Sequence, residues 1–197
     1  MRRYLEAAAK KLLAGELSDR ECGVEAALIQ ELREGRLPNN RPVLFPLKSG
    51  VPYQFPVPIT ARGGVRPATG TQAGHVDILA RHGRGRTSRL RIFEVKKADA
   101  NDAAQALEQA VAYAAALDCL LRGSPAYAKL LGYPKSPMPL PKFEATAVVF
   151  DSKETRDQMS SAEADLGGPT ELLDVKLSVL FYRWERQQDG VRRLVLK

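Results

Sequence analysis

Three residues of the kinds that serve phosphate chemistry lie in two neighbouring apolar segments of the chain. Asp77 lies within HVDILAR (75–81), and Glu94 and Lys96 lie within LRIFEVKK (90–97). Both segments alternate in the manner of β-strands, so Glu94 and Lys96, two positions apart, are expected to project from one face. The intervening HGRGRTSR contains glycines that favour a turn. We therefore predict a β-hairpin that carries all three residues.

The register of this predicted hairpin brings the two acidic residues together. If Arg81 lies near Leu90, Asp77 lies opposite Glu94, with about 5 Å between their Cβ atoms. Facing carboxylates repel each other unless a cation lies between them. Mg²⁺ or Mn²⁺ suits such oxygen ligands, polarises phosphate oxygens and acidifies the attacking water. A lysine beside the ion can orient that water or stabilise developing negative charge, so Asp77, Glu94 and Lys96 predict phosphodiester hydrolysis.

The elements before this hairpin are predicted from periodicity and from capping residues. The first fifteen residues are expected to form an amphipathic helix rather than a secretion signal, because charged residues interrupt the apolar ones. Ser18 and Glu21 have capping-box spacing, which predicts a helix to about Glu34 that stops at Gly35. The proline-rich segment 38–58 predicts extended chain, with an edge strand over Tyr53–Thr60 followed by a glycine-rich loop.

The elements after the hairpin complete an α/β pattern. Asn101 or Asp102 is expected to cap an alanine-rich helix that reaches about Leu121 and is ended by Gly123. There follow a proline-rich loop, a buried strand, a helix and a terminal hairpin, with predicted ranges Phe143–Phe150 and Ser152–Leu166 and a turn at Asp189-Gly190. This order predicts an α/β fold with a mixed central sheet, since a crossover helix implies a parallel strand pair.

At these residues the chain resembles a known family. Val76-Asp77, followed after sixteen residues by Glu94-Val95-Lys96, resembles the PD-(D/E)XK nuclease superfamily, whose restriction-endonuclease-like core has the order αβββαβ. Val76 replaces the proline of that family's first motif. Gln109 and Tyr113 are similar to the QxxxY motif of the RecB-like and lambda-exonuclease-like branches. Iron–sulfur members use four cysteines, and this chain has only two, so that subgroup is excluded.

The resemblance implies a single nuclease-like domain over 1–197, with a core at about 18–150 and a C-terminal extension at 151–197. It implies Mg²⁺ or Mn²⁺ as cofactor and DNA as substrate. The implied metal ligands are Asp77, Glu94, Val95 and an acidic residue of the first helix, for which Glu25 is the first choice and Glu31 stays open. Gln109 and Tyr113 are implied to contact the substrate or the catalytic residues.

Composition and charge agree with a nucleic-acid partner. The formal net charge of the 197 residues is +7, which favours polyanions. Five arginines near the site could be solubilising or could contact phosphate: Arg81, Arg84, Arg86, Arg89 and Arg91. Of these, Arg84 and Arg86 are predicted to bind the substrate. No apolar run approaches the roughly 18 to 20 residues of a membrane span. With no disulfide framework, Cys22 and Cys119 are expected to behave as small apolar residues of a cytoplasmic protein.

Several alternatives stay open at this stage. Glu94 and Lys96 could form a surface ion pair, and Gln109 and Tyr113 could be packing residues. The chain could be a catalytically silent nucleic-acid-binding subunit of a larger complex, a homo-oligomer, or a nuclease that acts on RNA. A last set of residues is predicted to be structural or solvated: His75 structural, His82 solvated, and Tyr182 and Trp184 packed in the terminal hairpin.

Overall fold

A computed structural model describes residues 21–37, 39–43, 53–57, 74–83, 89–98, 102–131, 141–188 and 192–197. These residues form a mixed α/β structure whose seven-stranded sheet has the order β1-β3-β4-β5-β6-β7, with β2 paired to β3. The strands are β1 (Asn40–Pro42), β2 (Tyr53–Val57), β3 (Gly74–His82), β4 (Arg89–Val95), β5 (Lys142–Phe150), β6 (Val175–Arg186) and β7 (Arg192–Leu196). The helices are α2 (Glu21–Arg33), α3 (Ala103–Gly123), α4 (Pro125–Leu130) and α5 (Lys153–Leu173).

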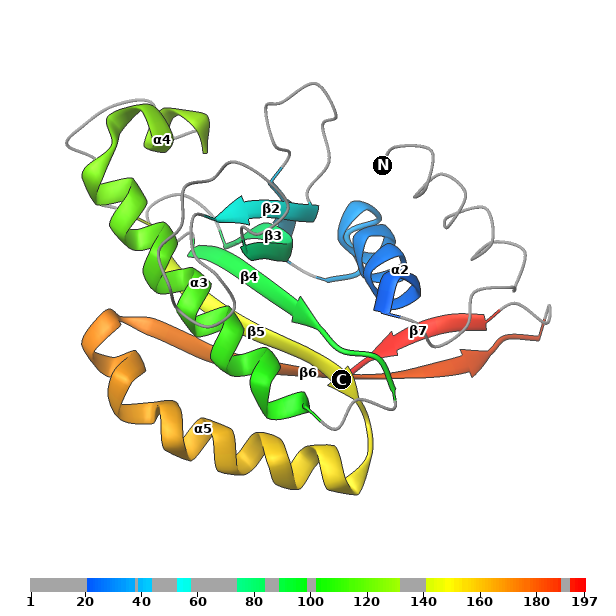
Figure 1. Ribbon diagram of the computed structural model, residues 1–197. Helices are drawn as coiled ribbons and strands as arrows, with labels where there is room; N and C mark the ends of the chain where they lie inside the picture. Colours follow the sequence, from blue (N-terminus) through cyan, green and yellow to red (C-terminus); the bar gives the residue numbers. More distant parts are fainter. Residues whose placement is uncertain are drawn as a thin grey trace.

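Helices cover both faces of the sheet (Figure 1). Helix α2 packs on one face, where Val24, Leu28 and Leu32 meet the side chains of Phe93 and Val95. Helices α3 and α5 pack on the other face and bury two further apolar clusters against it. Because successive strand residues point to opposite faces, each central strand supplies both layers, which explains why its sequence is almost continuously apolar.

Helix α2 ends where the sequence predicts. Gly35 has a φ of 71°, a left-handed conformation that glycine adopts without steric penalty. The N–H of Arg36 donates to the carbonyl of Glu31 at 3.0 Å, which closes the helix with a Schellman-type bond. The predicted capping box begins at Ser18, and that residue lies outside the described part of the chain, as does the predicted N-terminal helix.

The predicted hairpin is confirmed. Strands β3 and β4 are antiparallel, and Arg81 pairs with Leu90. The alternation of β4 is as expected, because Leu90 and Ile92 pack toward α3 while Phe93 and Val95 pack toward α2. On β3 it holds from Ile78 onward, but Val76 packs toward α3 and not on the same side as Ile78. The pairing of β3 with β4 begins at Ile78↔Phe93, whereas β3 stays paired with β2 as far as Gly74. Strands β3 and β4 therefore separate immediately before Ile78.

Parallel pairs join the later strands, as a crossover helix requires. Strand β4 pairs with β5 across α3, and β5 pairs with β6 across α5, while β6 and β7 form the predicted antiparallel pair. Helix α5 continues to Leu173, beyond the predicted end at Leu166. Helix α4 was not expected; it begins at Pro125, which has the backbone angle of a first helical residue and needs no N–H partner there.

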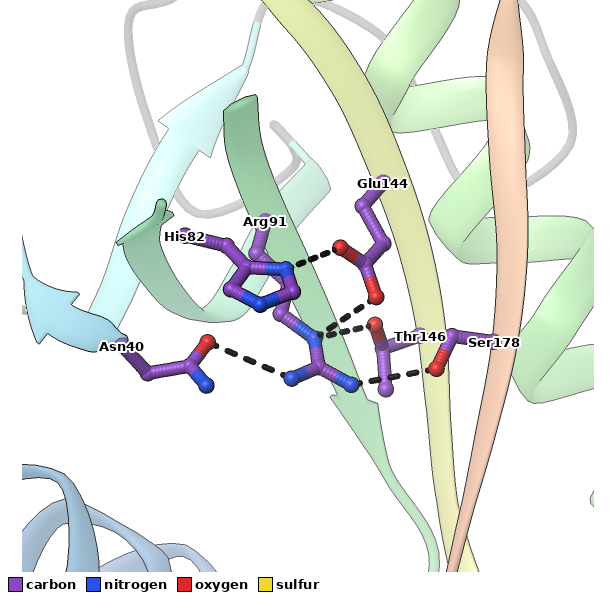
Figure 2. Close-up of polar contacts among 6 residues, drawn as sticks. All are labelled: Asn40, His82, Arg91, Glu144, Thr146 and Ser178. Carbon is purple, nitrogen blue, oxygen red and sulfur yellow. Dashed lines mark hydrogen bonds and ion pairs between the residues drawn. The ribbon is translucent and has the colours of Figure 1, made fainter. Parts of the chain in front are cut away.

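A buried polar cluster crosses the sheet on the α2 face (Figure 2). The Arg91 guanidinium donates to Thr146 Oγ1 at 2.8 Å, Ser178 Oγ at 3.1 Å and Asn40 Oδ1 at 3.2 Å, and its Nε lies 3.4 Å from Glu144 Oε1. His82 Nδ1 lies 2.6 Å from Glu144 Oε2. Burial alone would raise the pKa of Glu144, but Arg91 and His82 together lower it.

The structure corrects three expectations, two of them at this cluster. His82 was predicted to be solvated, yet its side chain is only 31% exposed and is bonded to Glu144. Arg91 was assigned to solvent or phosphate, but it is buried, because the β4–β5 register sets it directly beside Glu144. Cys119 was expected to pack as a small apolar residue and is instead exposed on α3.

None of the helices in the described ranges is both long and apolar enough to cross a bilayer.

Candidate active site

The two predicted carboxylates meet where β3 and β4 separate. Asp77 lies one residue beyond the last β3–β4 pair, Ile78↔Phe93, and Glu94 holds the facing position on β4. The Asp77 N–H lies 3.4 Å from Glu94 Oε1, and the Val95 N–H donates to Asp77 Oδ2 at 2.8 Å. Both acidic residues are buried, at 7% and 4% exposure. The register argued from the sequence therefore holds, and each acid contacts the other's strand.

This proximity makes the ionised form of Glu94 unfavourable. Burial raises the pKa of Glu94 well above its ordinary value, and the neighbouring charge of Asp77 raises it further. The ammonium of Lys96 and the Asp77 N–H act in the opposite direction, but they do not overcome these effects. A carboxyl held in this way is stabilised as an anion by any cation that reaches it.

Lys96 reaches the same site from just beyond the end of β4. Its Nζ donates to Oε1 of Gln109 at 3.1 Å, and its charge acts on Glu94. Gln109 lies on the second turn of α3, so the helix and the strand end hold the ammonium between them. The expectation that Glu94, Lys96 and Gln109 share one site agrees with these contacts.

Tyr113 closes the α3 side of the site. It lies four residues after Gln109, hence on the same helical face, and is 4% exposed. Burial and the nearby charges of Glu94 and Asp77 raise the pKa of its hydroxyl to about 12. The phenol therefore keeps its proton throughout the neutral range. The small residues Ala110 and Ala114 are fully buried between these turns, which lets α3 approach the sheet closely.

Two acidic residues of α2, Glu31 and Glu25, were the further metal ligands considered from the sequence. Glu31 binds Arg36 through both carboxylate oxygens, at 2.5 and 2.6 Å, and is thus already occupied. Glu25 is buried on α2, which packs on the Phe93 and Val95 face rather than on the α3 face. Within the described ranges no group of three or more His, Cys, Asp or Glu is arranged to hold a metal ion. The assignment of Glu25 as a ligand stays a prediction.

Of the arginines in and near the β3–β4 connection that were considered as phosphate contacts, the structure describes some and not others. Arg84 and Arg86 lie outside the described residues. Arg81 donates through Nη2 to the carbonyl of Leu131, so it ties β3 to the segment after α4.

One contact at the site was not expected from the sequence: the hydroxyl of Tyr182 donates to the backbone carbonyl of Lys96 at 3.0 Å. No local pattern could have indicated a contact between residues so far apart in the chain.

The donor set of this site suits a hard divalent cation. Asp77 and Glu94 are carboxylates held side by side, and Mg²⁺ commonly binds through one or two carboxylates while water completes its shell. A cation there would relieve the condition that raises the pKa of Glu94. Comparison with known proteins adds no assignment, because no family model, curated protein or solved structure matches this chain.

Proposed function

We propose that this protein is a metal-dependent nuclease that hydrolyses phosphodiester bonds, with DNA as its substrate. The observation that carries the proposal is the placement of Asp77 and Glu94 beside Lys96. The Asp77 nitrogen lies 3.4 Å from Glu94 Oε1, Lys96 Nζ donates to Gln109 Oε1 at 3.1 Å, and the charge of Lys96 acts on Glu94. A simple ion pair needs one acidic residue and one lysine, whereas here two acidic residues lie beside one lysine at the point where two strands separate. The sequence resemblance to PD-(D/E)XK nucleases rests on these same residues.

Mg²⁺ or Mn²⁺ would be held by the carboxylates of Asp77 and Glu94. When bound, the ion supplies Lewis acidity toward the phosphate ester. The backbone carbonyl of Val95 and the Glu25 carboxylate are the further ligands that the resemblance suggests. In support of the carboxylate pair, burial and Asp77 disfavour ionised Glu94 in the absence of a cation, so binding of the ion and loss of the Glu94 proton are coupled.

The other residues of the site position protons and charge. Lys96 offers an ammonium that can orient the attacking water or stabilise negative charge on the phosphoryl oxygens. Gln109 accepts a hydrogen bond from that ammonium and so limits its rotamers. Tyr113, protonated at neutral pH, is a hydrogen-bond donor beside the carboxylates rather than a base. These roles account for a QxxxY pair on the helix that follows the catalytic hairpin.

The fold supports the same proposal. The observed order from α2 to β5 is α2-β1-β2-β3-β4-α3-α4-β5, and β5 is parallel to β4. This order is compatible with an αβββαβ core if the short β1 and α4 are additions to it. We propose that the β6–β7 hairpin and α5 are additions to this core. The formal charge of +7 adds an attraction for the phosphate backbone that does not depend on base sequence.

Cleavage assays on three DNA forms test the proposal. Plasmid, linear duplex and single-stranded DNA, with an RNA of the same sequence, are incubated with Mg²⁺, Mn²⁺ or chelator. We expect DNA cleavage that requires metal and that Asp77→Asn or Lys96→Ala reduces by at least about 100-fold. The matched controls are Asp157→Asn and Lys97→Ala, which remove the same charges from exposed positions. Both should stay within a few-fold of the original chain.

The outcomes separate the alternatives. Metal-dependent cleavage of RNA alone would change the substrate, whereas binding of DNA without cleavage would indicate a silent binding subunit. Isothermal titration with Mn²⁺ distinguishes a silent site from an active one, because a silent site binds the ion weakly or not at all. Cleavage that survives both Asp77→Asn and Lys96→Ala would refute the assignment of the site.

A further inference from the structure

We infer that Tyr182, on the far strand β6, is a positioning residue for Lys96; this inference rests on the function proposed above. Its hydroxyl donates to the Lys96 backbone carbonyl at 3.0 Å, although 86 residues separate the two in sequence. The side chain is fully buried. A tyrosine that only packed the terminal hairpin would not need its polar end at this particular peptide.

The contact matters because of where Lys96 lies. Strand β4 ends at Val95, so the regular pairing of β4 no longer holds the next residue on both sides. The Lys96 N–H donates to the carbonyl of Val148 on β5 at 2.9 Å, and the Tyr182 hydroxyl binds the carbonyl of the same residue. Together the two bonds fix both polar groups of the Lys96 backbone just where its side chain leaves the strand.

The side chain of Lys96 is held from the opposite face of the sheet. Tyr182 belongs to the apolar cluster on the α2 face, with Phe93, Val95 and Val148, whereas Gln109 projects from α3 on the other face. Tyr182 is itself anchored: its ring packs edge-on against Phe150, with ring centroids 5.7 Å apart, and its carbonyl accepts the Asp151 N–H at 2.8 Å. Strand β6 thus positions the backbone of Lys96 through Tyr182, and helix α3 orients the Lys96 ammonium through Gln109.

Loss of the Tyr182 hydroxyl is expected to change the orientation of the Lys96 ammonium and not the affinity for DNA or for the metal ion. Removing the hydroxyl leaves the ring packing in place and frees the Lys96 carbonyl, so the ammonium is expected to sample positions away from the phosphate. Small displacements of a reacting group lower the rate much more than they lower affinity. Tyr182 touches neither substrate nor ion in this scheme. It acts only through Lys96.

The test compares Tyr182→Phe with Thr170→Val in metal-dependent DNA cleavage. Thr170 is a fitting control because it is buried on α5 and its hydroxyl donates to backbone carbonyls at 2.9 and 3.0 Å. We expect Tyr182→Phe to lower kcat about tenfold, with KM for DNA and the Kd for Mn²⁺ within about twofold. Thr170→Val should keep its kcat. Replacing Tyr182 with 4-aminophenylalanine restores a donor on the same ring and should restore most of the lost rate.

Each result decides the inference. An unchanged kcat in Tyr182→Phe, with the original chain active, overturns the positioning role and leaves the nuclease proposal standing. No cleavage by the original chain overturns both. An equal loss of kcat in Tyr182→Phe and Thr170→Val, or no recovery with 4-aminophenylalanine, shows general destabilisation and refutes the role. Thermal unfolding of each variant shows whether any lost rate follows lost stability.

Discussion

Replacing Glu94 by glutamine should make the metal-free protein more stable at neutral pH. The folded Glu94 carboxyl has a raised pKa, because it is buried and lies beside Asp77. Between its ordinary pKa and the raised one, the unfolded chain has released a proton that the folded chain retains. The free energy of unfolding therefore falls as pH rises through this window. Glu94→Gln cannot ionise and should not show this fall.

Burial is the largest cause of the raised pKa of Glu94, and the repulsion by Asp77 is the part of the effect whose size can be worked out. Two unit charges about 5 Å apart repel by about 3 kcal/mol at an effective dielectric constant of about 20. The ammonium of Lys96 offsets part of this repulsion. A net gain of about 2 kcal/mol corresponds to a rise in Tm of roughly 4 to 8 °C for a chain of this length.

The assay is thermal unfolding in chelator at pH 4 and pH 8. We expect Glu94→Gln to exceed the original chain in Tm at pH 8 and to match it at pH 4. Glu108→Gln, which removes the same charge from an exposed site on α3, should show no such difference. A lower Tm for Glu94→Gln at pH 8, or a gain that is equal at both values of pH, would refute the argument that burial and Asp77 disfavour the ionised carboxyl.

Three further predictions concern the scaffold, and urea denaturation measures each. Glu144→Leu leaves Arg91 buried without its carboxylate and should lower the free energy of unfolding by about 3 kcal/mol. Arg91→Met combined with Glu144→Leu should lower it clearly less. Equal losses would show that the unpaired charge is not the cause. Gly35→Ala should cost about 1 kcal/mol through backbone strain alone, since φ is 71° and a Cβ would meet nothing within 4 Å; no loss would contradict the left-handed helix end. Leu28 lies on α2 and is fully buried against the sheet, so Leu28→Ala should cost about 3 kcal/mol; a loss below about 1 kcal/mol would contradict tight packing on that face.

Local sequence was sufficient for most of the described elements, α4 excepted, and for the acidic pair. The two apolar segments 75–81 and 90–97, joined by a glycine-containing connection, implied a hairpin in which Asp77 faces Glu94, and Arg81↔Leu90 has that register. The stop of α2 at Gly35 was similarly readable, because few residues other than glycine adopt its φ.

Contacts between distant segments were decided by tertiary structure alone. The Lys96–Gln109 bond depends on how α3 packs, the Tyr182–Lys96 bond on β6 lying beside β5, and the burial of Arg91 on the register between β4 and β5. Nothing in the neighbouring sequence distinguishes Arg91 from the other arginines between positions 81 and 91. Its environment arises from parallel strands brought together by crossover helices, and such pairing has no local periodicity to reveal it. The sequence by itself determined which residues could perform chemistry, and the packing of the sheet determined what holds them in place.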